Sequence, residues 1–77
     1  MTDVRQWVWK LNMADMTCLN EEHNVIVKID NAGKEVKGRM TDMSMELFNK
    51  ISGLMNGPAI IRQITLEAEN EFQRQLN

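Results

Sequence analysis

The chain has 77 residues, a length that supports one small domain and excludes a two-domain enzyme with a cleft between lobes. Its 9 Lys and Arg residues against 11 Asp and Glu residues give a formal charge of −2, which excludes a polybasic nucleic-acid or membrane binder. Hydrophobic residues make up 43% and charged residues 26%, as in ordinary globular domains. We therefore expect a single small domain over residues 1–77.

The N-terminus and the cysteine content indicate a cytoplasmic protein. Residues 1–5 lack the basic start and following apolar stretch of a signal peptide. No apolar run approaches the length of about 20 residues that a membrane span needs. A single cysteine, Cys18, cannot form an intramolecular disulfide, which suits a reducing compartment. We expect no disulfide and no membrane partner.

The N-terminal third of the chain fits two kinds of element. Trp7, Trp9 and Leu11 alternate as in a strand, although Trp7 and Leu11 also lie on one side of a helix. The Trp-Val-Trp core favours a strand, and we predict one over residues 4–12. The segment that follows fits either a short helical turn or a short strand over residues 16–19.

A β-hairpin is the clearest unit of the sequence. Two β-branched runs, residues 24–30 and 35–41, flank a turn in which Gly33 is able to adopt a positive φ. We predict a register that pairs Asp30 with Glu35, because a slip by one residue would place valines opposite charges. One face of this hairpin would carry Val25, Val27, Ile29, Val36 and Met40. The other face would carry Ile26, Lys28, Asp30, Glu35, Lys37 and Arg39.

Two helices are predicted after the hairpin, over residues 45–56 and 58–75. Gly57 is placed to end the first helix and Pro58 to begin the second. The apolar stripe of the first helix would be Leu47, Phe48, Ile51, Leu54 and Met55. That of the second would be Ile61, Ile64, Ala68, Phe72 and Leu76. The predicted fold is therefore α+β, with a small antiparallel sheet, formed by the hairpin and the N-terminal strand, packed against two C-terminal helices.

Two groups of side chains have the chemistry of metal ligands, but ordinary packing is favoured for both. Cys18 and His23 lie five positions apart, whereas a structural zinc site needs four ligands and a nucleophilic thiol needs an orienting group. The thioethers of Met40, Met43 and Met45 suit Cu(I), but methionine more often fills irregular gaps in a core. We therefore expect a non-enzymatic protein without metal, cofactor or catalytic residues.

The functional hypothesis depends on two tryptophans and one leucine. Leu66 lies about 200° round its helix from Ile64, on the side of Arg62 and Gln73, and therefore points away from the apolar stripe. Tryptophan and arginine dominate interface hot spots, and a small core gains from oligomerisation. We predict an adaptor-like or inhibitor-like module that binds another protein or itself, as a homo-oligomer. The candidate residues are Trp7, Trp9, Arg62, Leu66 and Gln73.

The alternative hypothesis is a nucleic-acid-binding module. It would use Lys28, Lys37 and Arg39 on the polar hairpin face, with Trp7 or Trp9 stacking on bases if residues 4–12 pair alongside. Two carboxylates share that face with the three cations, a mixture typical of a solvated surface. A nucleic-acid binder would lose affinity steeply as the salt concentration rises.

Overall fold

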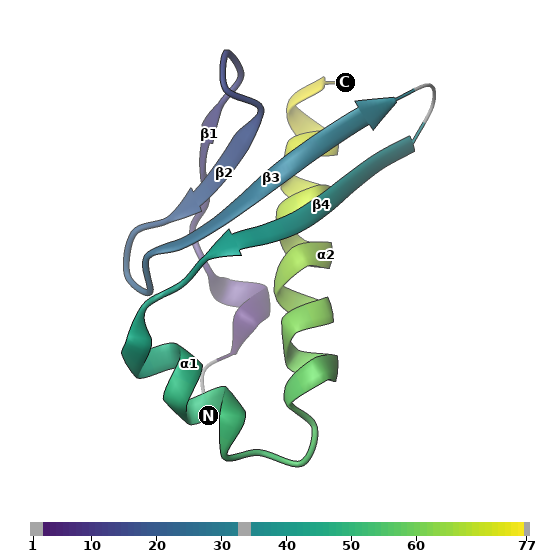
Figure 1. The fold of residues 1–77 in the computed structure, drawn as a ribbon. Coiled ribbons are helices and arrows are strands. Elements are labelled where there is room, and N and C mark those ends of the chain that lie inside the picture. Colours follow the sequence, from purple (N-terminus) through teal and green to yellow (C-terminus); the bar gives the residue numbers. More distant parts are fainter. Residues whose placement is uncertain (1–2, 33–34, 77) are drawn as a thin grey trace.

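A computed structural model describes residues 3–32 and 35–76 as a four-stranded antiparallel sheet with two helices (Figure 1). In chain order the elements are the 3₁₀ turn η1 (Val4–Gln6), β1 (Lys10–Asn12), β2 (Thr17–Asn20), β3 (Val25–Ala32), β4 (Glu35–Asp42), α1 (Met45–Ser52) and α2 (Gly57–Leu76). The strands are ordered β1-β2-β3-β4. The predicted α+β class is confirmed.

The molecule has two layers, the sheet and helix α2, with α1 and η1 closing one end (Figure 1). Helix α2 packs against β3 and β4 on the inner face of the sheet. The buried apolar side chains are Val4, Cys18, Val25, Val27, Ile29, Leu47, Ile51, Ile64, Ala68 and Phe72. All elements except β1 and β4 therefore contribute a buried side chain to a single core.

The N-terminal segment differs from the strand predicted over residues 4–12. The Asp3 carboxylate accepts a hydrogen bond from the Arg5 backbone N–H at 3.1 Å, which begins the η1 turn. Only Lys10–Asn12 is a strand, β1. In the stretch between them, the Asn20 side-chain amide donates to the Val8 carbonyl at 3.1 Å, in place of a partner in a sheet ladder. For the segment after β1 the sequence allowed a short helical turn or a short strand, and the structure has the strand, β2.

The predicted faces of the hairpin are confirmed, but its register is shifted by two residues. Asp30 pairs with Lys37 and Lys28 with Arg39, whereas the prediction paired Asp30 with Glu35. A shift by two residues leaves every side chain on the same face because side chains alternate with a period of two. The strands also run further than predicted, through Ala32 in β3, and the predicted positive φ of Gly33 lies outside the described residues.

Helix α1 is shorter than the predicted helix over residues 45–56. It begins after the N-cap Ser44, whose hydroxyl accepts a hydrogen bond from the Leu47 N–H at 3.2 Å, and Gly53 is its C-cap. Leu54 and Met55 therefore lie in the connection to α2 rather than on a helical stripe. This early end leaves apolar side chains outside the core, which bears on the candidate site.

Helix α2 extends one residue beyond the predicted range at each end. Its buried side includes Ile64, Ala68 and Phe72, as predicted, whereas Ile61 and Leu76 at the two ends of the predicted stripe are exposed. Within the part of the chain that the structure describes, no helix is both long enough and apolar enough to cross a membrane.

Helix α2 contacts the sheet closely at Gly38 of β4. The Glu69 carboxylate accepts a hydrogen bond from the Gly38 N–H at 2.7 Å. A Cβ atom at position 38 would lie 2.8 Å from the Val27 Cγ1 atom and 3.1 Å from the Glu69 Cγ atom. Glycine at this position therefore makes the close packing of helix on sheet possible.

Candidate functional site

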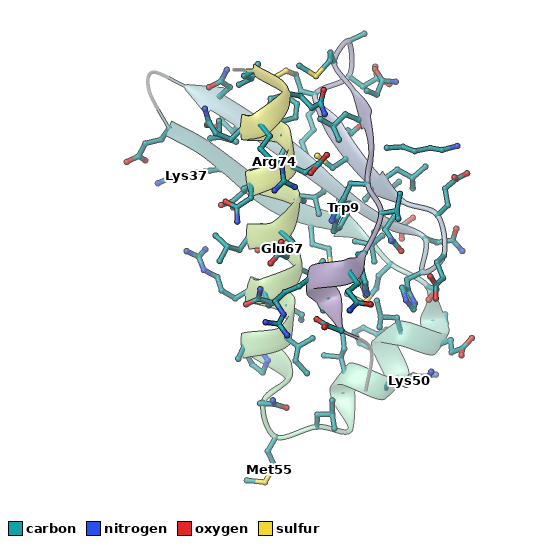
Figure 2. All side chains as sticks on the ribbon, turned by 180° about the vertical axis from the view of Figure 1, so that it is seen from behind. Trp9, Lys37, Lys50, Met55, Glu67 and Arg74 are labelled. Atoms are coloured by element: carbon teal, nitrogen blue, oxygen red, sulfur yellow. The ribbon has the colours of Figure 1, made fainter. Side chains whose placement is uncertain are left out.

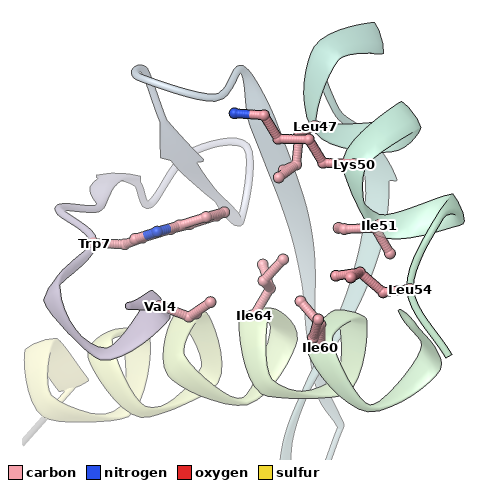
Figure 3. Close-up of a pocket in the computed structure, with 8 residues that line it drawn as sticks. All are labelled: Val4, Trp7, Leu47, Lys50, Ile51, Leu54, Ile60 and Ile64. Carbon is pink, nitrogen blue, oxygen red and sulfur yellow. The ribbon is translucent and has the colours of Figure 1, made fainter. Parts of the chain in front are cut away.

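An apolar pocket of about 340 Å³ lies at the end of the molecule where η1, α1 and α2 meet (Figure 3). Its lining residues are Val4, Trp7, Leu47, Lys50, Ile51, Leu54, Ile60 and Ile64. Lys50 is the only charged residue among them. We call this hollow the α1–α2 pocket. A volume of this size is within the range of about 300–1,000 Å³ that is typical of ligand pockets.

The walls of the α1–α2 pocket come from segments that are distant in sequence. Leu47 and Ile51, four residues apart on α1, and Ile64 on α2 form its buried floor. Helix α1 has only eight residues, too few to be stable alone. Packing of its Leu47 and Ile51 side chains on the rest of the core therefore holds it in place.

Trp7 forms the wall opposite α1 and is held by its neighbours. Its ring stacks on the His23 imidazole, with ring centroids 4.5 Å apart, and lies at a tilt to the Trp9 ring with centroids 5.8 Å apart. The His23 backbone N–H donates to the Asn20 side chain at 2.9 Å, and the same side chain donates to the Val8 carbonyl. Asn20 therefore fixes the β2–β3 turn and the tryptophan segment relative to each other.

The rim of the α1–α2 pocket carries one positive charge. The Lys50 side chain extends from α1 along one side of the pocket, toward the side on which Trp7 lies (Figure 3). Its ammonium is 3.4 Å from the Glu46 carboxylate, and both side chains are largely exposed. An exposed pair of this kind contributes only about 0–1 kcal/mol, so the Lys50 charge remains available to another anion.

Several exposed apolar side chains belong to the elements that form this end of the molecule. Of the nine large hydrophobic side chains that are exposed in the described residues, five lie between positions 45 and 61. They are Met45, Phe48, Leu54, Met55 and Ile61. Met55 points away from the body of the molecule at the α1–α2 connection (Figure 2). Together with the pocket, these side chains form what we call the apolar end.

The residues predicted to bind a protein lie on separate surfaces. Trp7 lines the α1–α2 pocket, whereas Trp9 packs beside it against the core. Arg62 borders a different hollow, between α2 and β4, together with Glu69. Leu66 is exposed, as predicted, and Gln73 is exposed on α2 as well. The structure therefore brings only Trp7 of this set to the pocket.

The cations of the alternative hypothesis are arranged differently from the prediction. Lys28 lies opposite Arg39, and Lys37 lies opposite Asp30, on the outer face of the sheet. The Lys28 ammonium donates to the Asp15 carbonyl, and the Lys37 ammonium is 3.5 Å from the Glu35 carboxylate. Both tryptophans pack against the core side of the sheet. They do not join the cations on the outer face as that hypothesis required.

The side chains with the chemistry of metal ligands pack in or against the core, with the exception of Met45. Met40 and Met43 pack against the core, while Met45 is exposed. Cys18 is fully buried and its thiol donates to the Ala68 carbonyl at 3.6 Å, whereas the His23 ring stacks on Trp7. Among residues 3–32 and 35–76 there is no group of three or more Cys, His, Asp or Glu side chains placed to hold a metal ion.

We expect the Cys18 thiol to be unreactive in the folded protein. Burial, and secondly the Glu71 carboxylate, raise its pKa from 9.0 to about 11, so the thiolate fraction at pH 8 falls about a hundredfold. Ellman's reagent should therefore modify the native protein at least a hundredfold more slowly than the urea-unfolded protein. Equal rates in the two states would contradict the buried placement.

The same raised pKa predicts how stability depends on pH. The unfolded thiol loses its proton near pH 9 while the folded thiol keeps it, so stability is retained below pH 9 and falls as the pH rises toward 11. Cys18→Ala is the control that isolates the contribution of the thiol. The variant should lose less stability than the wild type between these pH values.

Sequence reasoning missed most of the pocket. Leu47, Ile51 and Ile64 were correctly predicted to be apolar core residues, but nothing in their spacing indicated a hollow between them. Lys50 was not singled out, because a lysine on the flank of an amphipathic helix is ordinary. The signal in the sequence that Leu54 would leave the helix was Gly53, because glycine disfavours a helix interior.

The chain was also compared with known proteins. No protein-family model, no curated protein and no solved structure matches it.

Proposed function

We propose that this protein is a non-enzymatic protein-binding module whose apolar end docks a partner protein. The observation that supports the proposal is the α1–α2 pocket, at whose rim Leu54 is exposed, on elements that carry four further exposed apolar side chains. Apolar surface that gathers at one place marks interaction sites in soluble proteins, whereas single exposed residues do not. The remaining exposed apolar side chains, among them Val8 and Leu66, are dispersed along the chain.

The apolar end has the composition of an interface core. Interface centres are depleted in charge and enriched in aromatic side chains and methionine, and the apolar end presents Trp7, Phe48, Met45 and Met55 with Lys50 at its rim. Methionine adapts to irregular partner surfaces. A bulky apolar side chain of the partner would fill the pocket and form the buried anchor of the complex.

The geometry favours protein binding over nucleic-acid binding. Single-stranded nucleic acid is held by aromatic rings beside cations. The strands of this sheet contain no aromatic residue, and both tryptophans pack on the opposite side from Lys28 and Arg39. The cations of the outer face would therefore act without stacking partners.

Two leucines of equal exposure provide a matched test. Leu54, at the rim of the pocket, and Leu66, on another face of α2, are each 38% exposed. A protein partner is first isolated by cross-linking from the cells that produce the chain, and its affinity is then measured for both variants. We expect Leu54→Glu to weaken binding at least tenfold and Leu66→Glu to leave it within twofold, with both variants folded by circular dichroism.

The alternative results are informative. Loss of binding in Leu66→Glu with full binding in Leu54→Glu would move the interface to the Arg62 side of α2 and overturn the proposal. Failure to isolate any partner that binds the pure protein would also overturn it. If light scattering shows a dimer, and only Leu54→Glu dissociates it, the apolar end binds a second copy of the chain instead.

A further inference from the structure

The size of the α1–α2 pocket limits what enters it. An apolar cavity of about 150 Å³ accommodates benzene, so a pocket of about 340 Å³ has room for about a dozen non-hydrogen atoms. This is more than one aliphatic side chain requires. The occupant therefore includes a long or aromatic apolar group and the atoms next to it.

The charge at the rim limits what lies beside that apolar group. The α1–α2 pocket has one charged lining residue, Lys50, whose carbon stem covers apolar surface while its ammonium stays in water. A second, more polar hollow lies next to the α1–α2 pocket and shares its lining residues Val4 and Ile60. The lining of this second hollow includes Arg5. Both cations have exposed carboxylate partners in the chain, Glu46 and Asp3, and such pairs exchange readily for another anion.

We infer that the α1–α2 pocket receives a bulky apolar side chain of a protein partner with a carboxylate beside it, which reaches the Lys50 ammonium. This inference rests on the proposed function and specifies the chemistry of the partner. Met55, the most exposed apolar side chain among the described residues, does not supply this chemistry from a second copy of the chain, because its neighbours are Leu54 and Asn56. Entry of Met55 would bring no adjacent carboxylate to Lys50.

Small amphiphiles test this chemistry without the partner. Octanoate, octan-1-ol and octylammonium share one apolar tail and differ in the charge of the head group. Each is titrated into the full chain at pH 7, below its micelle concentration, and binding is followed by tryptophan emission and by amide shifts of residues 47–64. Trp7 is a built-in reporter because it lines the pocket.

We expect octanoate to bind about two- to fivefold more tightly than octan-1-ol, the factor that an exposed ion pair supplies, and octylammonium to bind more weakly than either. Lys50→Gln should equalise octanoate and octan-1-ol, and Lys50→Glu should reverse the order in favour of octylammonium. Lys28→Gln, a matched change on the outer face of the sheet, should leave the wild-type order unchanged.

Three results would overturn the inference. They are equal affinities of the three probes for the wild type, an octanoate preference that persists in Lys50→Gln, and shifts confined to residues outside the pocket. Absence of binding by every probe would also overturn it, because the pocket would then not accept an apolar tail. The comparison of Leu54→Glu with Leu66→Glu does not involve Lys50, so the proposed function is judged separately.

Discussion

Phe72→Ala is expected to lower the free energy of unfolding by about 3–5 kcal/mol. Phe72 is fully buried between α2 and the sheet, where it is the largest side chain of the core. Its removal takes away apolar contacts and leaves a cavity that the surrounding strands fill only in part. A domain of this length has a total stability of about 4–12 kcal/mol. The loss is therefore at least about a quarter of the total stability, and urea denaturation should show it as a lower midpoint.

The other phenylalanine of the chain is the matched control. Phe48 is 52% exposed on α1, so Phe48→Ala should change the free energy of unfolding by less than about 1 kcal/mol. Each variant removes one phenyl ring, from the core in Phe72→Ala and from the apolar end in Phe48→Ala. Equal losses of stability would show that α2 does not form the second layer of the fold as described.

Gly38→Ala is expected to destabilise the protein by about 1–3 kcal/mol. The added methyl group would lie 2.8 Å from the Val27 Cγ1 atom, and the Val27 side chain is fully buried and β-branched. Relief of this clash requires the Val27 side chain on β3 to shift. The Glu69 Cγ atom on α2, which would lie 3.1 Å from the added methyl group, must also move, and this would lengthen the hydrogen bond between Glu69 and the Gly38 N–H. The measurement is again urea denaturation.

Gly53 gives the opposite expectation for the same substitution. It caps α1 with a φ of −82°, and a Cβ atom there would be 3.8 Å from its nearest neighbours. Gly53→Ala should therefore raise stability by about 0.4–1 kcal/mol, because alanine restricts the unfolded chain.

A double-mutant cycle tests the clash at Gly38. Val27→Ala should recover part of the stability that Gly38→Ala loses. Strictly additive effects of Gly38→Ala and Val27→Ala would contradict the proposed clash.

The sequence predicted the faces of the elements better than their positions along the chain. Alternation placed Val25, Val27 and Ile29 correctly on the buried side of β3. The predicted register was wrong by two residues. An alternating pattern determines only which face of the sheet a side chain occupies, and a shift by two residues leaves that face unchanged. The irregularity between Ile26 and Val27, where the pairing with β4 shifts, has no counterpart in the pattern of apolar residues.

The candidate site was less predictable because it depends on tertiary placement. Trp7 was singled out for its residue type, but its position opposite α1 follows from the η1 turn and from hydrogen bonds to Asn20. Leu54 and Met55 matched a helical period, yet the Gly53 cap removed them from the helix. A pocket forms where elements do not quite fill the space between them, and spacing along one chain segment carries no information about that space.

The contact between Glu69 and Gly38 has a consequence for how copies of this chain meet one another. β4 borders only one other strand, so alternate N–H groups along its outer side are open to an extended segment from elsewhere. At Gly38, in the middle of β4, the carboxylate from α2 already occupies that donor. An intruding chain would have to expel a charged group before it could continue the ladder. The Glu69 carboxylate thereby opposes the addition of a further strand at the centre of this edge.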